Sequence, residues 1–101
     1  MKKLTVSVLL AATGGVLLAG EESAEVTSVS TDSRKAGEGA LFVPLVGERF
    51  DGHDYIDKAL ALGAAGCLCA RAPEAFEDGK FYISVPDTRL ALKALASWYR
   101  G

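Results

Sequence analysis

Apolar residues gather in short runs along this chain, and the first run predicts a helix followed by an extended segment. Residues 1–20 read MKKLTVSVLLAATGGVLLAG, two lysines and then an almost uncharged stretch. Thr5 can cap a helix over residues 6–13, which the Gly14–Gly15 pair would end. The VLLAG that follows predicts a short strand or an extended arm.

The same twenty residues also have the outline of a secretion signal, because a basic start, an apolar run and small residues follow one another. They are too few and too rich in glycine to span a membrane as a helix. Composition alone leaves both interpretations open. A secreted, non-enzymatic α/β module with a cleaved leader is therefore one hypothesis for this chain.

Four further runs are expected to form strands. Each is rich in β-branched, aromatic or other apolar residues and is bounded by glycine or polar residues. They cover residues 26–30, 40–46 (ALFVPLV), 64–70 (AAGCLCA) and 80–85 (KFYISV). Pro44 has no N–H to donate, so it predicts an edge or a bulge in the second of these strands.

Two later segments have helical periodicity. The stretch DYIDKALALG, residues 54–63, predicts a helix that ends at Gly63, and Asp87 is expected to cap a last helix that runs to about Tyr99. The expected apolar face of the first helix comprises Tyr55, Ile56, Ala59, Leu60 and Leu62, and that of the second comprises Leu92, Leu95, Ala96 and Tyr99.

The order of these elements predicts an α/β fold. After the opening helix it is β, β, α, β, β, α, which favours helices packed on a small mixed or parallel sheet, with the helix-linked strands parallel. A length of 101 residues with 50% hydrophobic side chains suits one domain, residues 1–101, built around one core.

Charge and cysteine content exclude several kinds of partner. The formal net charge is -2, which gives no basic field for nucleic acid or for a membrane surface, so any anion must be held by a local site. Cys67 and Cys69 would lie on the same face of a strand, a spacing that suits two buried free thiols better than a disulfide. No cysteine and histidine cluster indicates a metal site.

The densest polar cluster is STDSRK, residues 30–35, at the end of a predicted strand. Its hydroxyls, carboxylate and cations are suited to gripping a polar or anionic ligand at such a strand end. The alternative is a turn in which Asp32 accepts hydrogen bonds from nearby backbone amides and Arg34 makes a surface ion pair.

The second polar cluster is GERFDGHD, residues 47–54, where Glu48 and Arg49 are flanked by glycines that allow a ligand close to the backbone. His53 is the only histidine in the sequence. Without a second ligand at metal-binding spacing, it is better explained as a helix-start or loop-packing residue than as a general base or a metal ligand.

Motifs for bound nucleotides and for nucleophilic catalysis are absent. The glycines of GEGALFVPLVG form neither a GxGxxG nor a GxxxxGK[ST] phosphate loop, so ATP binding by this chain is not expected. No serine, histidine and aspartate arrangement, and no cysteine and histidine pair, has a spacing that supports a nucleophile.

Taken together, these stretches resemble the N-terminal domain of the Mur ligases of peptidoglycan synthesis. The resemblance covers nearly the whole chain and is carried by the joint pattern of STDSR, GERFDGHDYI, ALGAAG and DTRLALKALA. STDSR and GERFDGHD favour the MurF type, which joins D-alanyl-D-alanine to UDP-N-acetylmuramoyl-tripeptide. The MurE type, which acts on UDP-N-acetylmuramoyl-dipeptide and shares this type of domain, stays the alternative.

The resemblance implies a division of labour within a longer, three-domain ligase. The N-terminal domain would hold the UDP end of UDP-N-acetylmuramoyl-tripeptide, while the central and C-terminal domains would bring ATP, Mg²⁺ and the incoming dipeptide. This chain by itself would then have no cofactor, no metal and no catalytic residue. The parent would be an ATP-dependent, amide-forming ligase of the cytoplasm, serving cell-wall synthesis, cell shape and division.

The resemblance also implies binding residues. Thr31 and Ser33 fall where the family contacts the nucleotide, and Glu48, Arg49 and Phe50 fall on a second uridine-diphosphate loop. Hydroxyls and loop amides can bond uracil and diphosphate, Arg49 can supply charge, and Phe50 can offer a ring face. The residues expected to support these contacts are Asp32, Arg34, Gly47, Asp51 and His53.

One departure from the family lies in the first helix. The family usually has acidic residues where this chain has Ser7 and Val8, so the outer face of the helix is unusually apolar. Because UDP-linked muramoyl precursors are made in the cytoplasm, the resemblance argues against a cleaved leader. The segment is then expected to belong to the fold, with Val6 and Val8 covered by the rest of the domain.

Overall fold

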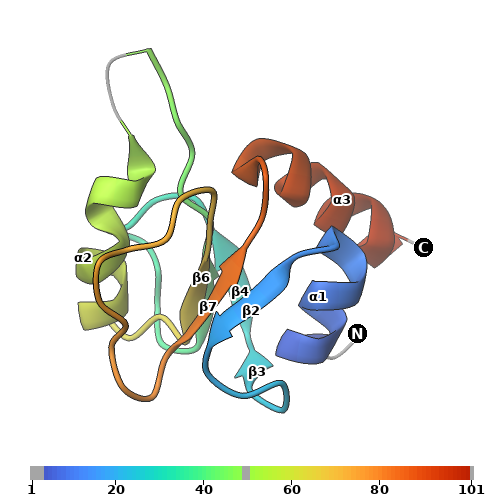
Figure 1. The fold of residues 1–101 in the computed structure, drawn as a ribbon, viewed down its shortest axis with the longest axis horizontal. Coiled ribbons are helices and arrows are strands. Elements are labelled where there is room, and N and C mark those ends of the chain that lie inside the picture. The colour runs from blue at the N-terminus through green and yellow to red at the C-terminus, as the bar shows by residue number, and fades with distance from the viewer. Residues whose placement is uncertain (1–3, 49–50, 101) are drawn as a thin grey trace.

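A five-stranded sheet with helices on both faces organises the protein (Figure 1). The computed structural model describes residues 4–48 and 51–100. The strands are β1 (Leu4–Thr5), β2 (Val16–Ala19), β3 (Glu25–Val26), β4 (Ser28–Ser30), β5 (Ala40–Phe42), β6 (Gly66–Cys69) and β7 (Phe81–Ser84). The helices are α1 (Val6–Thr13), the 3-10 turn η1 (Gly52–Tyr55), α2 (Ile56–Ala61) and α3 (Thr88–Arg100).

The main sheet has the strand order β2-β7-β6-β5-β4. Strands β4, β5, β6 and β7 are parallel to their neighbours, and only β2 is antiparallel, to β7. A separate two-stranded sheet pairs β1 with β3. The expected mixed α/β sheet is therefore confirmed, including the parallel pairing of β5 with β6 across helix α2.

The opening segment is part of this fold. Thr5 caps α1 by accepting a hydrogen bond from the Val8 N–H at 3.3 Å, and Gly14 ends the helix with φ 71°. Strand β2 follows and pairs with β7, so the short strand expected over VLLAG is present. Val6 is fully buried in a cluster with residues of β3 and α3, and Val8 is half-buried. Residues of β3 and α3 therefore cover the side of the helix on which Val6 lies.

Two predicted strands were too long. The run 26–30 is broken at Thr27, because Val26 pairs with Leu4 in the small sheet whereas Ser28–Ser30 pairs with β5. The run 40–46 ends as a strand at Phe42, and Pro44 lies buried beyond it, where no ladder hydrogen bond is required of it.

The apolar faces of the two later helices were predicted only in part. Tyr55 and Leu62 are 43% and 52% exposed, because they lie in η1 and just beyond α2 rather than within the helix. On α3 the buried apolar residues are Ala91 and Leu95, whereas Leu92 is half-buried and Ala96 is exposed. The side chain of Tyr99 lies outside the described residues.

The sheet separates two layers of core. On one face α1 and α3 pack together over a cluster that includes Leu9, Leu68 and Ile83. On the other face α2 covers a cluster that includes Phe42, Tyr82 and both cysteines, which are free and buried as expected. Figure 1 shows α2 on one side of the strands and α1 and α3 on the other.

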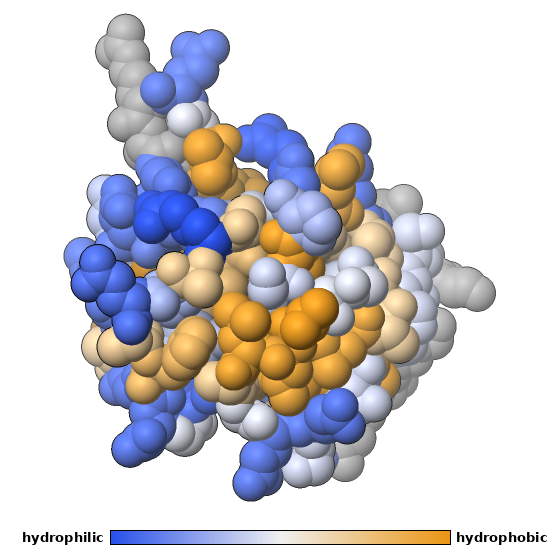
Figure 2. Space-filling model, in the orientation of Figure 1, coloured by the Kyte–Doolittle hydropathy of each residue, from blue (hydrophilic) through white to orange (hydrophobic). Residues whose placement is uncertain are grey.

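Strand β2 forms one edge of the sheet and has an apolar surface. Val16 is 63% exposed and Leu18 is 36% exposed, and Figure 2 shows an orange patch where Figure 1 places β2. Within residues 4–48 and 51–100, no helix is both long enough and apolar enough to cross a membrane.

Candidate functional site

The loops that follow β4, β5, β6 and β7 lie along one edge of the sheet, here called the carboxyl edge. This arrangement follows from the parallel direction of the four strands. Ligands of open α/β sheets bind outside the carboxyl ends of such strands. Both polar clusters of the sequence are in these loops, since residues 30–35 follow β4 and residues 47–54 follow β5.

The first loop is a tight polar turn. Ser30 and Asp32 fold it, because the Asp32 N–H donates to Ser30 Oγ and the Ser30 hydroxyl donates to the Asp32 carbonyl. The Arg34 guanidinium and backbone N–H both donate to the Asp32 carboxylate and hold its pKa below the usual range. The turn interpretation therefore holds for Asp32 and Arg34, whose charges are paired locally.

The two hydroxyl residues of this turn differ in accessibility. Thr31 is exposed, whereas Ser33 is buried with 8% of its surface accessible. The Val43 N–H donates to the Ser30 carbonyl at 2.8 Å, so the first loop begins beside the chain that leads into the second loop. The pairing of β4 with β5 thus brings the two polar clusters to neighbouring positions.

The second loop rises away from the sheet between β5 and α2 (Figure 1). Its base is closed by a bridge between Val46 and Asp51 and by a hydrogen bond of 2.8 Å from the Gly52 N–H to the Leu45 carbonyl. A Cβ atom at Gly52 would lie 2.7 Å from the Leu45 nitrogen, so this close approach requires glycine. Gly47 and Glu48 are exposed, and Arg49 and Phe50 lie outside the described residues.

Asp51 and His53 fasten this loop to the next strand. Asp51 Oδ1 accepts from the His53 N–H at 2.9 Å and lies 2.6 Å from His53 Nδ1. The Ala70 N–H, just after β6, donates to His53 Nε2 at 2.8 Å. Because Nε2 is an acceptor, the imidazole is neutral with its proton on Nδ1. His53 is therefore a buried packing residue, as expected, and not a free base.

Two arginines at this edge were not identified from the sequence. Arg71 follows β6 and donates to Asp51 at 3.0 Å and to Asp54 at 3.4 Å. Arg89 lies in the first turn of α3 and donates to the Val46 carbonyl at 3.3 Å. For Arg71 the available signal was its position just after a predicted strand, because the carboxyl ends of parallel strands meet at one edge. No comparable signal was available for Arg89, which lies inside a helix.

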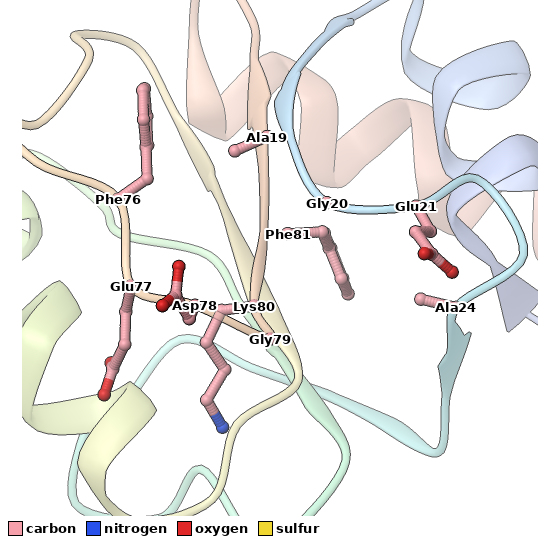
Figure 3. A pocket seen from close by; sticks show the side chains of 10 residues that line it. All are labelled: Ala19, Gly20, Glu21, Ala24, Phe76, Glu77, Asp78, Gly79, Lys80 and Phe81. Atoms are coloured by element: carbon pink, nitrogen blue, oxygen red, sulfur yellow. The ribbon is translucent and has the colours of Figure 1, made fainter.

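A hollow in the described residues lies elsewhere. It has a volume of about 530 Å³ and is bounded by the end of β2, the loop after it and the start of β7, including Glu21, Glu77 and Lys80 (Figure 3). These segments lie at the opposite edge of the sheet from the two polar loops. The Lys80 ammonium donates to the Ala64 carbonyl at 2.7 Å.

Along the carboxyl edge the described residues present hydroxyls, backbone amides, guanidinium groups and carboxylates. Among residues 4–48 and 51–100 no group of three or more histidine, cysteine and acidic side chains is placed to hold a metal ion. The sequence has no GxxxxGK[ST] loop for a nucleotide triphosphate. Hydroxyls, backbone amides and guanidinium groups at a sheet edge can bind a polar, anionic ligand.

Comparison with known proteins gives consistent matches over most of the chain. The family model described as "Mur ligase family, catalytic domain" matches residues 25–100. UDP-N-acetylmuramoyl-tripeptide–D-alanyl-D-alanine ligase of Escherichia coli K12 is 42% identical over 97 residues, which are 94% of this chain and 21% of that protein.

A second relative carries the name of a different ligase. UDP-N-acetylmuramoyl-L-alanyl-D-glutamate–2,6-diaminopimelate ligase of Parabacteroides distasonis is 36% identical over 92 residues, which are 90% of this chain and 19% of that protein. The chain therefore spans about a fifth of the length of the relatives it matches.

A solved structure matches in the same way. The crystal structure of MurF from Acinetobacter baumannii superposes with a TM-score of 0.87 at 33% identity and covers 99% of this chain and 21% of its own. The part of these enzymes to which the chain corresponds is their N-terminal domain. The chain belongs to the Mur ligase family.

Proposed function

We propose that this domain holds the UDP end of UDP-N-acetylmuramoyl-tripeptide, as the N-terminal part of a ligase that adds D-alanyl-D-alanine in peptidoglycan synthesis. Thr31 and Ser33 on the first loop bind the nucleotide, together with Glu48, Arg49 and Phe50 on the second. Asp32, Arg34, Gly47, Asp51 and His53 support the two loops.

The observation that carries this proposal is the meeting of the two polar loops at the carboxyl edge. They are separated in the sequence by residues 36–46, and the parallel pairing of β4 with β5 places them side by side. The similarity over nearly the whole chain to the Escherichia coli ligase supports the choice of substrate. A nucleotide at this edge follows the general placement of ligands in open α/β sheets.

The described contacts divide the residues into those that can meet a ligand and those that build the loops. The Asp32 carboxylate accepts from Arg34, and the Asp51 carboxylate accepts from His53 and Arg71. In this proposal both residues therefore support the loops rather than bind the nucleotide. Among the described residues, exposed Thr31 and Glu48 have no such partner, and Ser33 keeps 8% of its surface accessible. Backbone amides at Gly47 add donors without a side chain to obstruct the ligand.

The chemistry of ligation is assigned to other parts of the longer protein. ATP and Mg²⁺ would supply the activation of a carboxylate there, but the residues of this chain do not fit either group, because they include no phosphate loop and no described acidic cluster for the metal. The role of this domain is to bind and orient the nucleotide end of the substrate. A cytoplasmic location is part of the proposal, since the UDP-linked precursor is made there.

Titration of the 101-residue protein with UDP tests the proposal. Amide chemical shifts around Ser33 and Glu48 are expected to move on millimolar UDP, whereas those lining the hollow near Glu77 stay fixed. Ser33→Ala is expected to weaken binding, and Ser97→Ala, on the exposed side of α3, is the matched control. Shifts confined to other regions, with the two loops unchanged, would refute the site.

The second candidate is the same domain of the MurE type. The observation that favours it is the similarity to the 2,6-diaminopimelate ligase of Parabacteroides distasonis. Both types present a UDP group to this domain, so binding of UDP does not separate them. The discriminating measurement is made on the full-length protein, which is offered D-alanyl-D-alanine with the tripeptide substrate and a diamino acid with the dipeptide substrate.

A further inference from the structure

We propose that Arg71 and Arg89 are positioning residues that fix the stem of the second loop from both sides. The stem is defined here as Leu45, Val46, Asp51 and Gly52. The link to nucleotide affinity rests on the proposed function above, whereas the effect on the stem itself does not.

The stem is a small structure with few bonds of its own. It consists of the Val46 to Asp51 bridge and the hydrogen bond from the Gly52 N–H to the Leu45 carbonyl. Val46 is 53% exposed and Gly47 and Glu48 are exposed, so the loop gains little from apolar burial. A stem of this kind needs contacts from neighbouring elements to keep one conformation.

Arg89 contacts one side of the stem. It lies in the first turn of α3, where Asp87 caps the helix by accepting from the Arg89 and Leu90 N–H groups. The backbone of Arg89 is therefore fixed, and its guanidinium donates to the Val46 carbonyl at 3.3 Å. This bond connects the ascending side of the loop to a helix packed on the sheet.

Arg71 contacts the other side. It follows β6, and its guanidinium joins Asp51 in the stem and Asp54 in η1. Asp51 is held at the same time by His53, whose ring is anchored to the end of β6 through Ala70. The descending side of the loop is thus tied twice to one strand end.

The charges indicate that Arg71 acts on the loop and not on the ligand. Its guanidinium faces two carboxylates, which leave it little net attraction for a diphosphate. Arg89 directs one of its N–H donors to a backbone carbonyl of the stem. A loop that is ordered before binding loses less conformational entropy when the nucleotide arrives, so the two arginines raise affinity without touching it.

Hydrogen exchange of the ligand-free protein tests the positioning role directly. The Gly52 N–H reports on the stem, because it bonds across it to Leu45. Arg71→Ala and Arg89→Ala are expected to speed exchange at Gly52 by about fivefold, because each removes a hydrogen bond that holds the stem. Lys93→Ala, which removes one exposed charge from α3, is the matched control and is expected to change nothing there. Unchanged exchange in both arginine variants overturns the proposal.

Titration with UDP and with uridine tests the link to binding. A positioning role predicts that each arginine variant binds both ligands about three to ten times more weakly, by the same factor for each. Arg71→Lys is expected to recover part of the loss, because it keeps the ion pair. A loss of UDP affinity with uridine unaffected would instead assign a direct diphosphate contact and overturn the positioning role.

The two proposals fail in different ways. If the unaltered protein binds neither UDP nor uridine, the proposed function is refuted, and the exchange rates at Gly52 still decide whether the arginines fix the stem. Both arginines are exposed, so the substitutions leave the core intact, and a melting curve of each variant checks this.

Discussion

His53 Nε2 accepts a hydrogen bond from the Ala70 N–H at 2.8 Å, and this bond joins the start of η1 to the end of β6. The imidazole is buried, with 3% of its side chain accessible, and its other nitrogen lies 2.6 Å from Asp51. The only histidine of the chain thus serves the architecture of the carboxyl edge.

Replacing His53 by phenylalanine is expected to destabilise the protein by about 1 to 3 kcal/mol, because the ring volume is kept while the Ala70 N–H and Asp51 lose their partner. Thermal unfolding followed by circular dichroism measures the change. Tyr55→Phe, an exposed position two residues on, is the control and is expected to melt like the unaltered protein. Equal melting of both variants would contradict the role given to His53.

Asp51 predicts a specific dependence of stability on pH. The hydrogen bond from the His53 backbone, helped by the His53 ring and Arg71, lowers its pKa from 3.8 to about 2. Because the folded-state pKa lies below the unfolded value, the stabilisation is present above about pH 4 and is lost as the pH falls towards 2. Asp51→Asn is therefore expected to reduce the melting temperature at pH 6 but to approach the unaltered protein near pH 2.

The control for this experiment is Asp78→Asn, an exposed acid in the loop before β7. It is expected to shift the melting temperature by little at any pH. A difference between Asp51→Asn and the unaltered protein that stays constant from pH 6 to pH 2 would refute the assignment.

Leu9 tests whether the opening segment belongs to the core. It is fully buried on α1, so Leu9→Ala is expected to cost about 2 to 5 kcal/mol of unfolding free energy. Leu18→Ala, on the exposed face of β2, removes the same atoms and is expected to cost much less. Urea unfolding measures the free energy of unfolding of both variants. Equal losses in the two would show that the opening segment does not contribute to the core.

The substitutions Gly66→Ala and Gly37→Ala form a matched pair, because only the first would place a Cβ atom against neighbouring atoms. A Cβ at Gly66 would lie 2.4 Å from both Cγ and the carbonyl oxygen of Phe81, so Gly66→Ala is expected to cost about 3 kcal/mol or more. At Gly37 no atom lies within 4 Å of the added carbon, and Gly37→Ala is expected to stay within about 0.5 kcal/mol of the unaltered protein. Chemical denaturation distinguishes the two, and a harmless Gly66→Ala would contradict the tight pairing of β6 with β7.

The two cysteines are expected to be unreactive in the folded protein. Both are fully buried, and the neighbouring Cys69 thiol, together with burial, raises the pKa of Cys67. A thiol reagent such as dithionitrobenzoate should modify them only as fast as the protein unfolds. Rapid modification under native conditions, or a disulfide between them after mild oxidation, would contradict this.

Local signals made the first helix predictable. Thr5 and Gly14 are the residues at which α1 begins and ends, and both act through neighbours only a few positions away. Asp87 at the start of α3 is a further example, since its carboxylate accepts from the first N–H groups of the helix. Caps of this kind can be recognised without knowledge of the rest of the fold.

Features that depend on distant pairing could not be predicted in this way. The break at Thr27 arises because Val26 and Ser28 pair with strands of two different sheets, and nothing in their own side chains indicates it. The buried face of α3 centres on Ala91 and Leu95 because of its packing against α1. When the apolar pattern of a helix contains several small residues, the sequence alone does not determine which face of the helix turns toward the core.

The candidate site was predicted to a similar extent. The polar clusters were visible as short motifs, and a turn with a surface ion pair at Arg34 was one of the two interpretations of the first cluster, although its partner Asp32 was not named. The contributions of Arg71 and Arg89 were missed, because each is a single residue in an otherwise ordinary loop or helix. Only the order of the strands in the sheet brings them beside Asp51 and Val46.

The pairing of β2 with β7 has a consequence for synthesis of the protein on the ribosome. Val16 finds its partner in Ser84, and Leu17 in Ile83, so the apolar start of the chain stays without its neighbour until most of the domain has emerged. During that interval a stretch that resembles a secretion signal is exposed to the factors that sort nascent chains. The time needed to synthesise and release the chain between β2 and β7 therefore sets how long the cell can mistake this segment for a leader.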